Sequence, residues 1–248
     1  MMFEKLFNAK KKEPHCSAVI VAAGHSTRMG EDKLFMPLGC MPVLARTLLV
    51  FENCKAVDEI VVVTRSEKIM EVADMCKKYG ISKASKVIFG GATRSESSLA
   101  GVSEVKSGAE LIAIHDGARP FVTEEIIENT VAAAAKYMAA APAVKSTDTL
   151  KAIDEDGFAI GTVDRETTVR IQTPQIFSAD LIKGALSKAV RDGRNVTDDC
   201  AAIEAMGVKV FMTEGDEDNI KLTTEKDILI ANEIIKRRGD YVEDRSRV

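Results

Sequence analysis

The sequence predicts an α/β protein with a Rossmann-like, mostly parallel sheet, helices on both faces and an inserted β-hairpin arm. Three observations predict this fold. Short apolar runs rich in β-branched residues recur along the chain, segments with helical periodicity separate them, and one stretch alternates in polarity around a turn. Strands that alternate with helices of about 10 to 15 residues are typical of βαβ units. At 248 residues and 46% hydrophobic, the chain can form one large domain or two small ones.

The strands are predicted from apolar runs that are too short to form helices on their own. The first covers residues 17–22, with the sequence Ser-Ala-Val-Ile-Val-Ala, and is expected to be buried. Similar runs follow at residues 59–64, 86–89, 111–115 and 208–212.

Helices are predicted between these runs from their end signals. Ser66 is a candidate N-cap, an apolar stripe follows at positions 69, 72, 73 and 76, and Gly80 supplies a stop. Thr123 precedes two glutamates that suit the positive end of a helix running towards Met138.

One stretch departs from this alternation. Residues 149–153 and 158–163 alternate in polarity around 154–157, Asp-Glu-Asp-Gly, which is a good turn sequence. The pattern predicts a hairpin arm at about 147–172 that projects from the domain and joins two copies as a homodimer. A hairpin folded back onto its own domain is the alternative.

The chain is expected to divide into a charged lead-in at 1–15, one domain at 16–240 and a tail at 241–248. The lead-in lacks the apolar centre of a signal peptide, and no apolar run approaches the roughly 20 residues that cross a bilayer. We therefore expect a cytoplasmic protein without a membrane partner.

Charge and cysteine content exclude other classes of function. The net charge of −4 gives no positive field that would attract nucleic acid. The five cysteines contain no CxxC pair, which argues against a zinc site or a disulfide framework. Cys200 is expected to be a small buried filler rather than a reactive thiol.

The segment after the first strand is the first candidate for function, because ligands of open α/β sheets bind beyond the carboxyl ends of the strands. Residues 22–33 are small and polar and carry two cations, Arg28 and Lys33. Such a loop can bring backbone N–H groups and positive charge to a phosphate. The spacing fits neither the Walker A motif nor the dinucleotide fingerprint GxGxxG. A surface loop with incidental charges is the alternative.

Residues 22–24, 28–30 and 33–35 resemble the signature loop of sugar-phosphate nucleotidyltransferases. More closely, the chain resembles the 2-C-methyl-D-erythritol 4-phosphate cytidylyltransferases of the non-mevalonate isoprenoid pathway. The resemblance continues in the same order through residues 90–97, 115–121, 162–165, 172–175, 196–199 and 218–223. Any one of these segments is weak evidence, whereas the ordered set is specific.

The resemblance implies transfer of CMP from CTP to a polyol phosphate with release of pyrophosphate. It implies Mg²⁺ held mainly by the CTP phosphates, with no metal ligands from the protein. The catalytic residues it implies are Arg28, Lys33, Arg165 and Lys221. The CTP-binding residues are Ala22, Ala23, Gly24, Gly90, Gly91, Arg94, Ser97 and Asp116. The substrate-binding residues are Asp116, Arg119, Thr149, Arg165, Thr173, Thr197 and Lys221. Arg165 follows the hairpin and is expected to reach a neighbouring subunit's site.

Each of these motifs also has a purely structural interpretation. Gly90 and Gly91 could form a tight turn before a helix capped by Thr93, and Thr197 resembles an N-cap. His115 has no partner at metal-ligand spacing and is interpreted as structural. The chain departs from the family at Ala92, where relatives often carry an acid, at Ser26, and in a shorter spacing from Arg28 to Lys33.

Three rival functions remain open. A ribitol-5-phosphate cytidylyltransferase shares several of the motifs, although Asp-Gly-Ala-Arg at 116–119 and Thr-Val-Asp-Arg at 162–165 favour the methylerythritol family. An NAD-dependent oxidoreductase is disfavoured by the failed glycine fingerprint. A non-catalytic nucleotide-binding protein would be expected to lack Arg28, Lys33 or Lys221.

Overall fold

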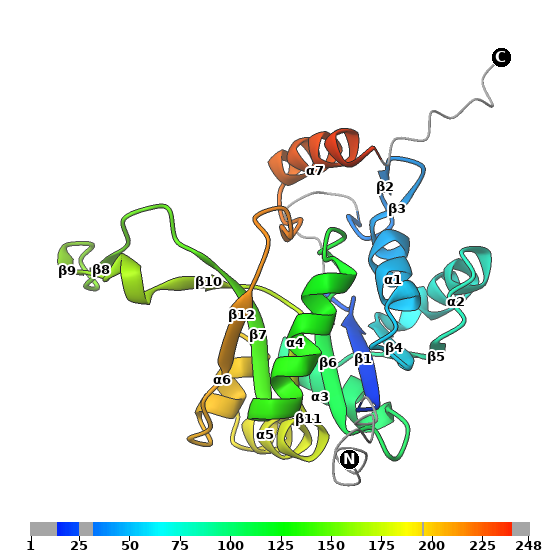
Figure 1. Cartoon of the computed structure of the whole chain (residues 1–248), viewed down its shortest axis with the longest axis horizontal. Coiled ribbons are helices and arrows are strands. Elements are labelled where there is room, and N and C mark those ends of the chain that lie inside the picture. The colour runs from blue at the N-terminus through cyan, green and yellow to red at the C-terminus, as the bar shows by residue number, and fades with distance from the viewer. Residues whose placement is uncertain (1–13, 25–31, 195, 240–248) are drawn as a thin grey trace, which may run out of the picture.

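In the part of the chain that the structure describes, the elements are arranged around a central sheet of eight strands (Figure 1). The computed structural model describes residues 14–24, 32–194 and 196–239. The strand order is β10-β7-β11-β6-β1-β4-β5, and β12 pairs with β7. The strands are β1 (Cys16–Val21), β4 (Glu59–Thr64), β5 (Ala84–Phe89), β6 (Leu111–Asp116), β7 (Ala139–Lys145), β10 (Val169–Ile171), β11 (Gln175–Ser178) and β12 (Phe211–Glu214).

The pairing is mostly parallel, as the sequence predicts. Strand β1 pairs in parallel with β4 on one side and β6 on the other, and β4 pairs in parallel with β5. Strands β10 and β11 run antiparallel to their neighbours. Because the chain moves from β1 outward to β5 and then returns to the other side of β1, the carboxyl end of β1 is a topological switch point, where such sheets bind ligands.

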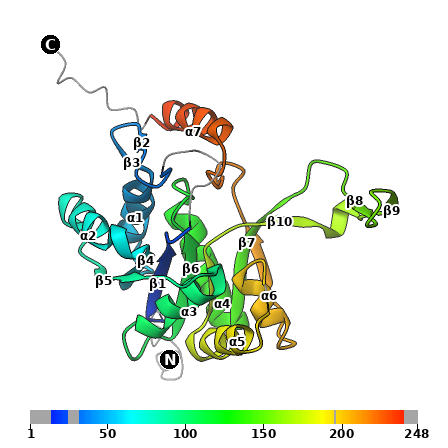
Figure 2. The ribbon, with the colours of Figure 1, turned by 180° about the vertical axis from the view of Figure 1, so that it is seen from behind.

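Helices cover both faces of the sheet (Figures 1 and 2). One apolar core joins Ile20, Ile60 and Ala113 to residues of α1, α2, α4 and α7. The other joins Val19 and Ile112 to residues of α3, α5 and α6. The helices are α1 (Val43–Asn53), α2 (Ile69–Lys78), α3 (Arg94–Glu104), α4 (Glu124–Tyr137), α5 (Ala179–Arg191), α6 (Asp199–Glu204) and α7 (Glu225–Arg238). No helix among the described residues is long and apolar enough to cross a membrane.

The predicted helix ends are partly confirmed. Thr123 caps α4 by accepting a hydrogen bond from the backbone N–H of Ile126, and Gly80 has a φ of +68° just beyond α2. The prediction of Ser66 as an N-cap is wrong. A short 3₁₀ turn, η2 (Ser66–Lys68), precedes α2, and the hydroxyl of Ser66 donates to Glu67 instead of capping.

The strand predictions differ from the structure at several places. The run at 208–212 is misplaced, since β12 covers Phe211–Glu214. Strands β7, β10 and β11 are absent from the sequence prediction. The sequence of β7 is Ala-Ala-Ala-Pro-Ala-Val-Lys, so it is a strand because β10, β11 and β12 pair with it and not because of its residue preferences.

The hairpin projects from the domain (Figures 1 and 2). Strands β8 (Lys151–Ile153) and β9 (Ala159–Thr162) pair antiparallel in a sheet of their own. Apolar side chains of the hairpin are exposed: Phe158, just before β9, is 72% exposed and Ile160 is 68% exposed. The hairpin therefore does not fold back onto its own domain.

Candidate active site

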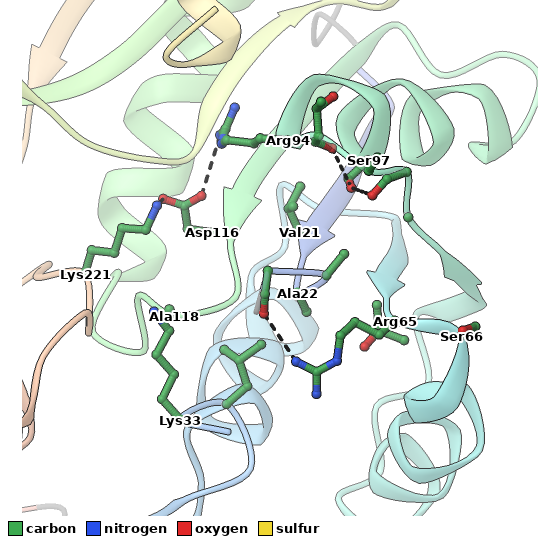
Figure 3. A pocket seen from close by; sticks show the side chains of 18 of the residues that line it. Val21, Ala22, Lys33, Arg65, Ser66, Arg94, Ser97, Asp116, Ala118 and Lys221 are labelled. Carbon is green, nitrogen blue, oxygen red and sulfur yellow. Dashed lines mark hydrogen bonds and ion pairs between the residues drawn. The ribbon is translucent and has the colours of Figure 1, made fainter. Parts of the chain in front are cut away.

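A cavity of about 710 Å³ lies at the carboxyl ends of β1, β4, β5 and β6, at the switch point of the sheet (Figure 3). This size suits a small-molecule ligand, for which pockets of about 300–1,000 Å³ are usual. Its walls bring together ten of the residues predicted from sequence: Ala22, Ala23, Gly24, Lys33, Gly90, Gly91, Arg94, Ser97, Asp116 and Lys221. Arg28 lies outside the described residues.

The floor of the cavity is backbone that small side chains leave accessible. The ends of β1 and β5 approach so closely that a Cβ atom on Gly90 would lie 2.7 Å from the Cβ of Ala23 and 2.6 Å from the Oγ of Ser97. A Cβ atom on Gly91 would lie 2.3 Å from the Cβ of Glu96. Glycine is therefore required at both positions by packing alone.

The structural interpretation of the Gly-Gly turn is confirmed. Thr93 accepts from the backbone N–H of Glu96 at 3.1 Å. The Glu96 carboxylate accepts in return from the backbone N–H groups of Thr93 at 3.1 Å and Ala92 at 2.7 Å, which forms a capping box at the start of α3. This cap leaves the cavity face of the turn open, so the same turn can serve a ligand.

Asp116 lies in the cavity between positively charged side chains, of which Figure 3 shows Arg94 and Lys221. Its Oδ2 lies 2.9 Å from Nζ of Lys221 and 3.6 Å from Nε of Arg119, and its Oδ1 lies 3.6 Å from Nη2 of Arg94. Burial would raise the pKa of Asp116, but Lys221, Arg94 and Arg119 outweigh it and hold that pKa well below its usual range. Asp116 is therefore negative at neutral pH.

Arg94 is held by a second carboxylate that the sequence predictions did not include. Its Nη1 lies 2.7 Å from Oδ2 of Asp199, a residue that is completely buried. Asp199 ends the motif at 196–199, from which only Thr197 was assigned to the site. The signal in the sequence was the two consecutive acidic residues at 198 and 199. Asp198 caps a helix, and Asp199 pairs with Arg94.

Hydrogen bonds between three loops fix the segment that carries Lys221. Arg119 donates to the backbone oxygen of Asn219 at 2.6 Å, and the backbone N–H of Leu222 donates to Ala118 at 2.9 Å. The Asn219 side chain donates to the backbone oxygen of Thr173 at 3.0 Å. Lys221 is thus held against the loop that follows β6, although it lies far from that loop in sequence.

His115 and Thr173 support Asp116 from behind. The backbone N–H of Asp116 donates to Oγ1 of Thr173 at 3.1 Å, and this hydroxyl also lies 3.0 Å from Nδ1 of His115. Nε2 of His115 lies 3.1 Å from the backbone oxygen of Arg119, so a neutral ring protonated on Nε2 satisfies both contacts. Complete burial lowers the pKa of His115 to about 4. These contacts support the structural interpretation of this histidine.

The remaining predicted substrate residues do not line the cavity. Thr173 and Arg119 lie behind its wall, as described above. Thr149 and Arg165 belong to the arm; Arg165 lies in the 3₁₀ turn η3 (Arg165–Thr167) and donates to the backbone oxygen of Thr147 at 3.4 Å. Thr197 is exposed.

Thr197 is also not the N-cap that the sequence suggested. Asp198 caps α6 instead, because its carboxylate accepts from the backbone N–H of Ala201 at 2.9 Å.

Sequence reasoning also missed Arg65. This residue directly follows β4 and lines the cavity, with its side chain 14% exposed. The signal was a cation immediately after a buried strand next to β1, but no recognised motif contains it.

Among the described residues, no three His, Cys, Asp or Glu side chains are grouped so that they could hold a metal ion. The cysteines Cys16, Cys40, Cys54, Cys76 and Cys200 are free. Cys200 is buried, and its burial raises its thiol pKa, as expected for a filler.

The fold and the cavity together define a class of protein: an α/β nucleotide-binding protein whose pocket has accessible backbone and several cations, as phosphates require. Comparison with known proteins is more specific. The sequence profile described as "IspD: 2-C-methyl-D-erythritol 4-phosphate cytidylyltransferase" matches residues 16–237. The chain belongs to this family of cytidylyltransferases.

Relatives and solved structures agree with this placement. The chain is 41% identical to the 2-C-methyl-D-erythritol 4-phosphate cytidylyltransferase of Clostridium novyi, over 88% of this chain and 96% of the relative. It is 42% identical to that of Caldanaerobacter subterraneus, over 89% and 99%. The crystal structure of the Anaerococcus prevotii 4-diphosphocytidyl-2C-methyl-D-erythritol synthase superposes with a TM-score of 0.82 at 34% identity, covering 91% of this chain and all of that one.

Proposed function

We propose that this chain transfers CMP from CTP to 2-C-methyl-D-erythritol 4-phosphate, giving 4-diphosphocytidyl-2-C-methyl-D-erythritol and pyrophosphate. Family membership supports the reaction. The observation that carries it to this chain is the convergence of Lys33, Arg94 and Lys221 on one cavity, in which the ionised Asp116 pairs with Arg94 and Lys221. A cavity of this charge suits two phosphorylated substrates.

The chemistry is an in-line displacement at phosphorus. A phosphate oxygen of the acceptor forms a new bond to the α-phosphorus of CTP, while the bond from that phosphorus to the pyrophosphate oxygen breaks. The attacking oxygen is already anionic, so the protein's contribution is positioning and charge stabilisation. Lys33 is proposed to stabilise the charge that develops on the α-phosphate and the leaving pyrophosphate, together with Arg28.

The remaining cavity residues are proposed to position the two substrates. Backbone groups of Ala22, Ala23 and Gly24 would face the phosphates, and Gly90, Gly91 and Ser97 would face the cytosine. Asp116 would accept hydrogen bonds from ribose hydroxyls, supported by Arg94. Lys221 would hold the acceptor's phosphate near the α-phosphorus.

The cavity fits a magnesium ion that arrives with CTP. Among the described residues, the lining carboxylates are Glu67 and Asp116, and both oxygens of Asp116 already face cations. Mg²⁺ commonly keeps its waters and binds substrate phosphates through few protein carboxylates. When bound, the ion would neutralise the triphosphate. Chelation is expected to abolish turnover, and added Mg²⁺ is expected to restore it.

The arm is proposed to complete the site of a second copy. Arg165 and Thr149 lie on the arm, away from the cavity of their own protomer, and the arm exposes Phe158 and Ile160. A homodimer that exchanges arms would cover these apolar side chains and bring Arg165 to the acceptor's phosphate.

The direct test is turnover with purified chain. The full chain is incubated with CTP, Mg²⁺ and either 2-C-methyl-D-erythritol 4-phosphate or ribitol 5-phosphate, while pyrophosphate and the CDP-linked product are measured. Turnover with the first acceptor and little with the second is expected. Preference for ribitol 5-phosphate, or no pyrophosphate with either acceptor from folded protein, would overturn the proposal.

A further inference from the structure

Arg65 connects the two described residues that flank positions 25–31. From the end of β4 its Nη1 donates to the backbone oxygen of Gly24 at 3.4 Å, and its Nη2 forms an ion pair with Oδ2 of Asp32. Its Nε lies 2.8 Å from Oε1 of Glu67. Figure 3 shows the guanidinium pointing towards the end of β1. One planar group therefore joins three segments beside the cavity.

Asp32 in turn fixes the backbone that carries Lys33. Its Oδ1 accepts from the backbone N–H of Leu34 at 3.4 Å, and its backbone oxygen accepts from Phe35 at 2.9 Å. Leu34 is buried in the core, and its backbone oxygen accepts from Leu44 at 2.9 Å. Lys33 thus lies in a turn anchored on one side by the core and on the other by Asp32.

The charges around Arg65 favour a structural connection over direct contact with phosphate. The carboxylates of Asp32 and Glu67 both pair with the guanidinium of Arg65, so its positive charge is already balanced before a phosphate binds. The side chains of Arg65 and Asp32 are only 14% and 18% exposed, which makes this pair less screened than a surface ion pair. Arginine suits such a role because its planar donors can serve several acceptors at once.

We propose that Arg65 is a positioning residue for the cytidylyl transfer: by joining Gly24 to Asp32 it sets the position of Lys33 relative to the end of β1. The inference rests on the proposed function, in which Lys33 stabilises the reacting phosphates. A misplacement of about 1 Å at a reacting group can cost on the order of 10²-fold in rate. Loss of Arg65 should therefore lower kcat rather than weaken CTP binding.

The test is a set of variants in the full chain: Arg65→Met, Asp32→Asn, their combination, and Arg65→Met in a Lys33→Ala background. Arg65→Met and Asp32→Asn should each lower kcat by about 10-fold or more, with the KM for CTP changed by less than about threefold. The combination should be no worse than either single variant, because both remove the same link. In the Lys33→Ala background the effect of Arg65→Met should vanish.

Other outcomes separate the alternatives. Additive losses from Arg65→Met and Asp32→Asn, a raised KM for CTP, or a full Arg65→Met effect in the Lys33→Ala background would overturn the inference. Arg191→Met, at an exposed arginine on α5, is the matched control and should keep wild-type kinetics. If Arg65→Met does not fold, the same cycle is run with Arg65→Lys, which can pair with Asp32 but cannot bridge to Gly24 and should recover part of kcat. Wild-type protein without turnover would refute the proposed function instead.

Discussion

Lys221 and Asp116 form an ion pair of 2.9 Å in the cavity wall, although they come from distant parts of the chain. The pair forms because Arg119 and Asn219 join the loop after β6 to the loop before α7. Asp116 pairs with three cations, so its charge helps to hold Lys221, and together with Asp199 also Arg94, in position in the cavity wall.

Replacing Asp116 by asparagine is therefore expected to lower kcat/KM by on the order of 10²-fold. The amide keeps the size of the side chain but leaves Lys221, Arg94 and Arg119 without their shared carboxylate. Steady-state kinetics with both substrates measures the loss. Glu104→Gln, which removes an exposed acid paired with Lys86, is the control and should change little. Equal kinetics for the Asp116→Asn variant and wild type would remove this carboxylate from the site.

Lys33→Ala is expected to lower kcat by about 10²–10³-fold, because it removes a cation that acts on charge developing in the transition state. The side chain is partly exposed in the cavity wall, so the free energy of unfolding should change little. A pyrophosphate-release assay and thermal unfolding measure the two effects. The same kinetic loss is expected for Arg28→Ala. Near-full turnover of either variant would refute its role as a stabiliser.

The sequence predicts the part of the fold where local composition and tertiary position agree. The strands β1, β4 and β6 are rich in valine and isoleucine and are buried except at Val21, and the sequence predicts each of them to within a residue or two. Strand β7 is alanine-rich and β11 has four residues, so both are strands only because neighbours pair with them. Their existence could not be read from local preference.

The candidate site likewise contains residues that local motifs predict and residues whose roles depend on distant parts of the chain. Residues within recognised motifs, such as Lys33, Gly90 and Asp116, were predicted and lie around one cavity. Arg65 lies in no recognised motif, and its partner Asp32 is far away in sequence. Asp199 ends a recognised motif, but its importance depends on Arg94, which is also distant in sequence and which no local pattern connects to it. The positions of Arg165 and Thr149 depend on where the arm packs, which a single chain does not determine.

Arg165→Ala is expected to raise the KM for the acceptor with little change in kcat, since Arg165 is proposed to hold the acceptor's phosphate. Arg170→Ala is the matched control, because Arg170 is an exposed arginine at the base of the arm that pairs with Glu217. Measuring initial rates over a range of acceptor concentrations tests this. An unchanged KM would remove Arg165 from the site.

Mixing subunits tests whether Arg165 acts on the neighbouring site. Arg165→Ala and Lys33→Ala chains are each unfolded, mixed and refolded together. If the arm acts in trans, the mixed dimer contains one fully native site, and activity measured well below the acceptor KM of the Arg165→Ala variant should exceed that of either variant. Activity no higher than the average of the two parents would show that Arg165 acts within its own protomer.

Dimerisation is expected to depend on the exposed apolar side chains of the arm. Phe158 is 72% and Ile160 is 68% exposed, so burial against a second copy would remove much apolar surface from water. The double variant Phe158→Asp, Ile160→Asp should sediment as a monomer and should still unfold cooperatively on heating, which shows that the monomer is folded. Met70→Asp, at a side chain 71% exposed on α2, is the control and should remain dimeric. A monomeric wild-type protein would contradict the arm's proposed role.

The buried His115 is expected to make the protein less stable at acidic pH. Burial lowers its pKa from 6.5 to about 4, so between these values the unfolded chain binds a proton that the folded chain does not. The stabilisation from this group is complete above about pH 6.5 and is lost as the pH falls towards 4, by at most on the order of 3 kcal/mol. Urea unfolding at about pH 7, 5.5 and 4.5 measures this loss of stability.

The variant His115→Asn should be less stable than wild type at pH 7, because it loses contacts with Thr173 and Phe51. Its stability should nevertheless fall less steeply with acid than that of wild type, and parallel pH profiles would show that the histidine does not remain neutral in the folded protein.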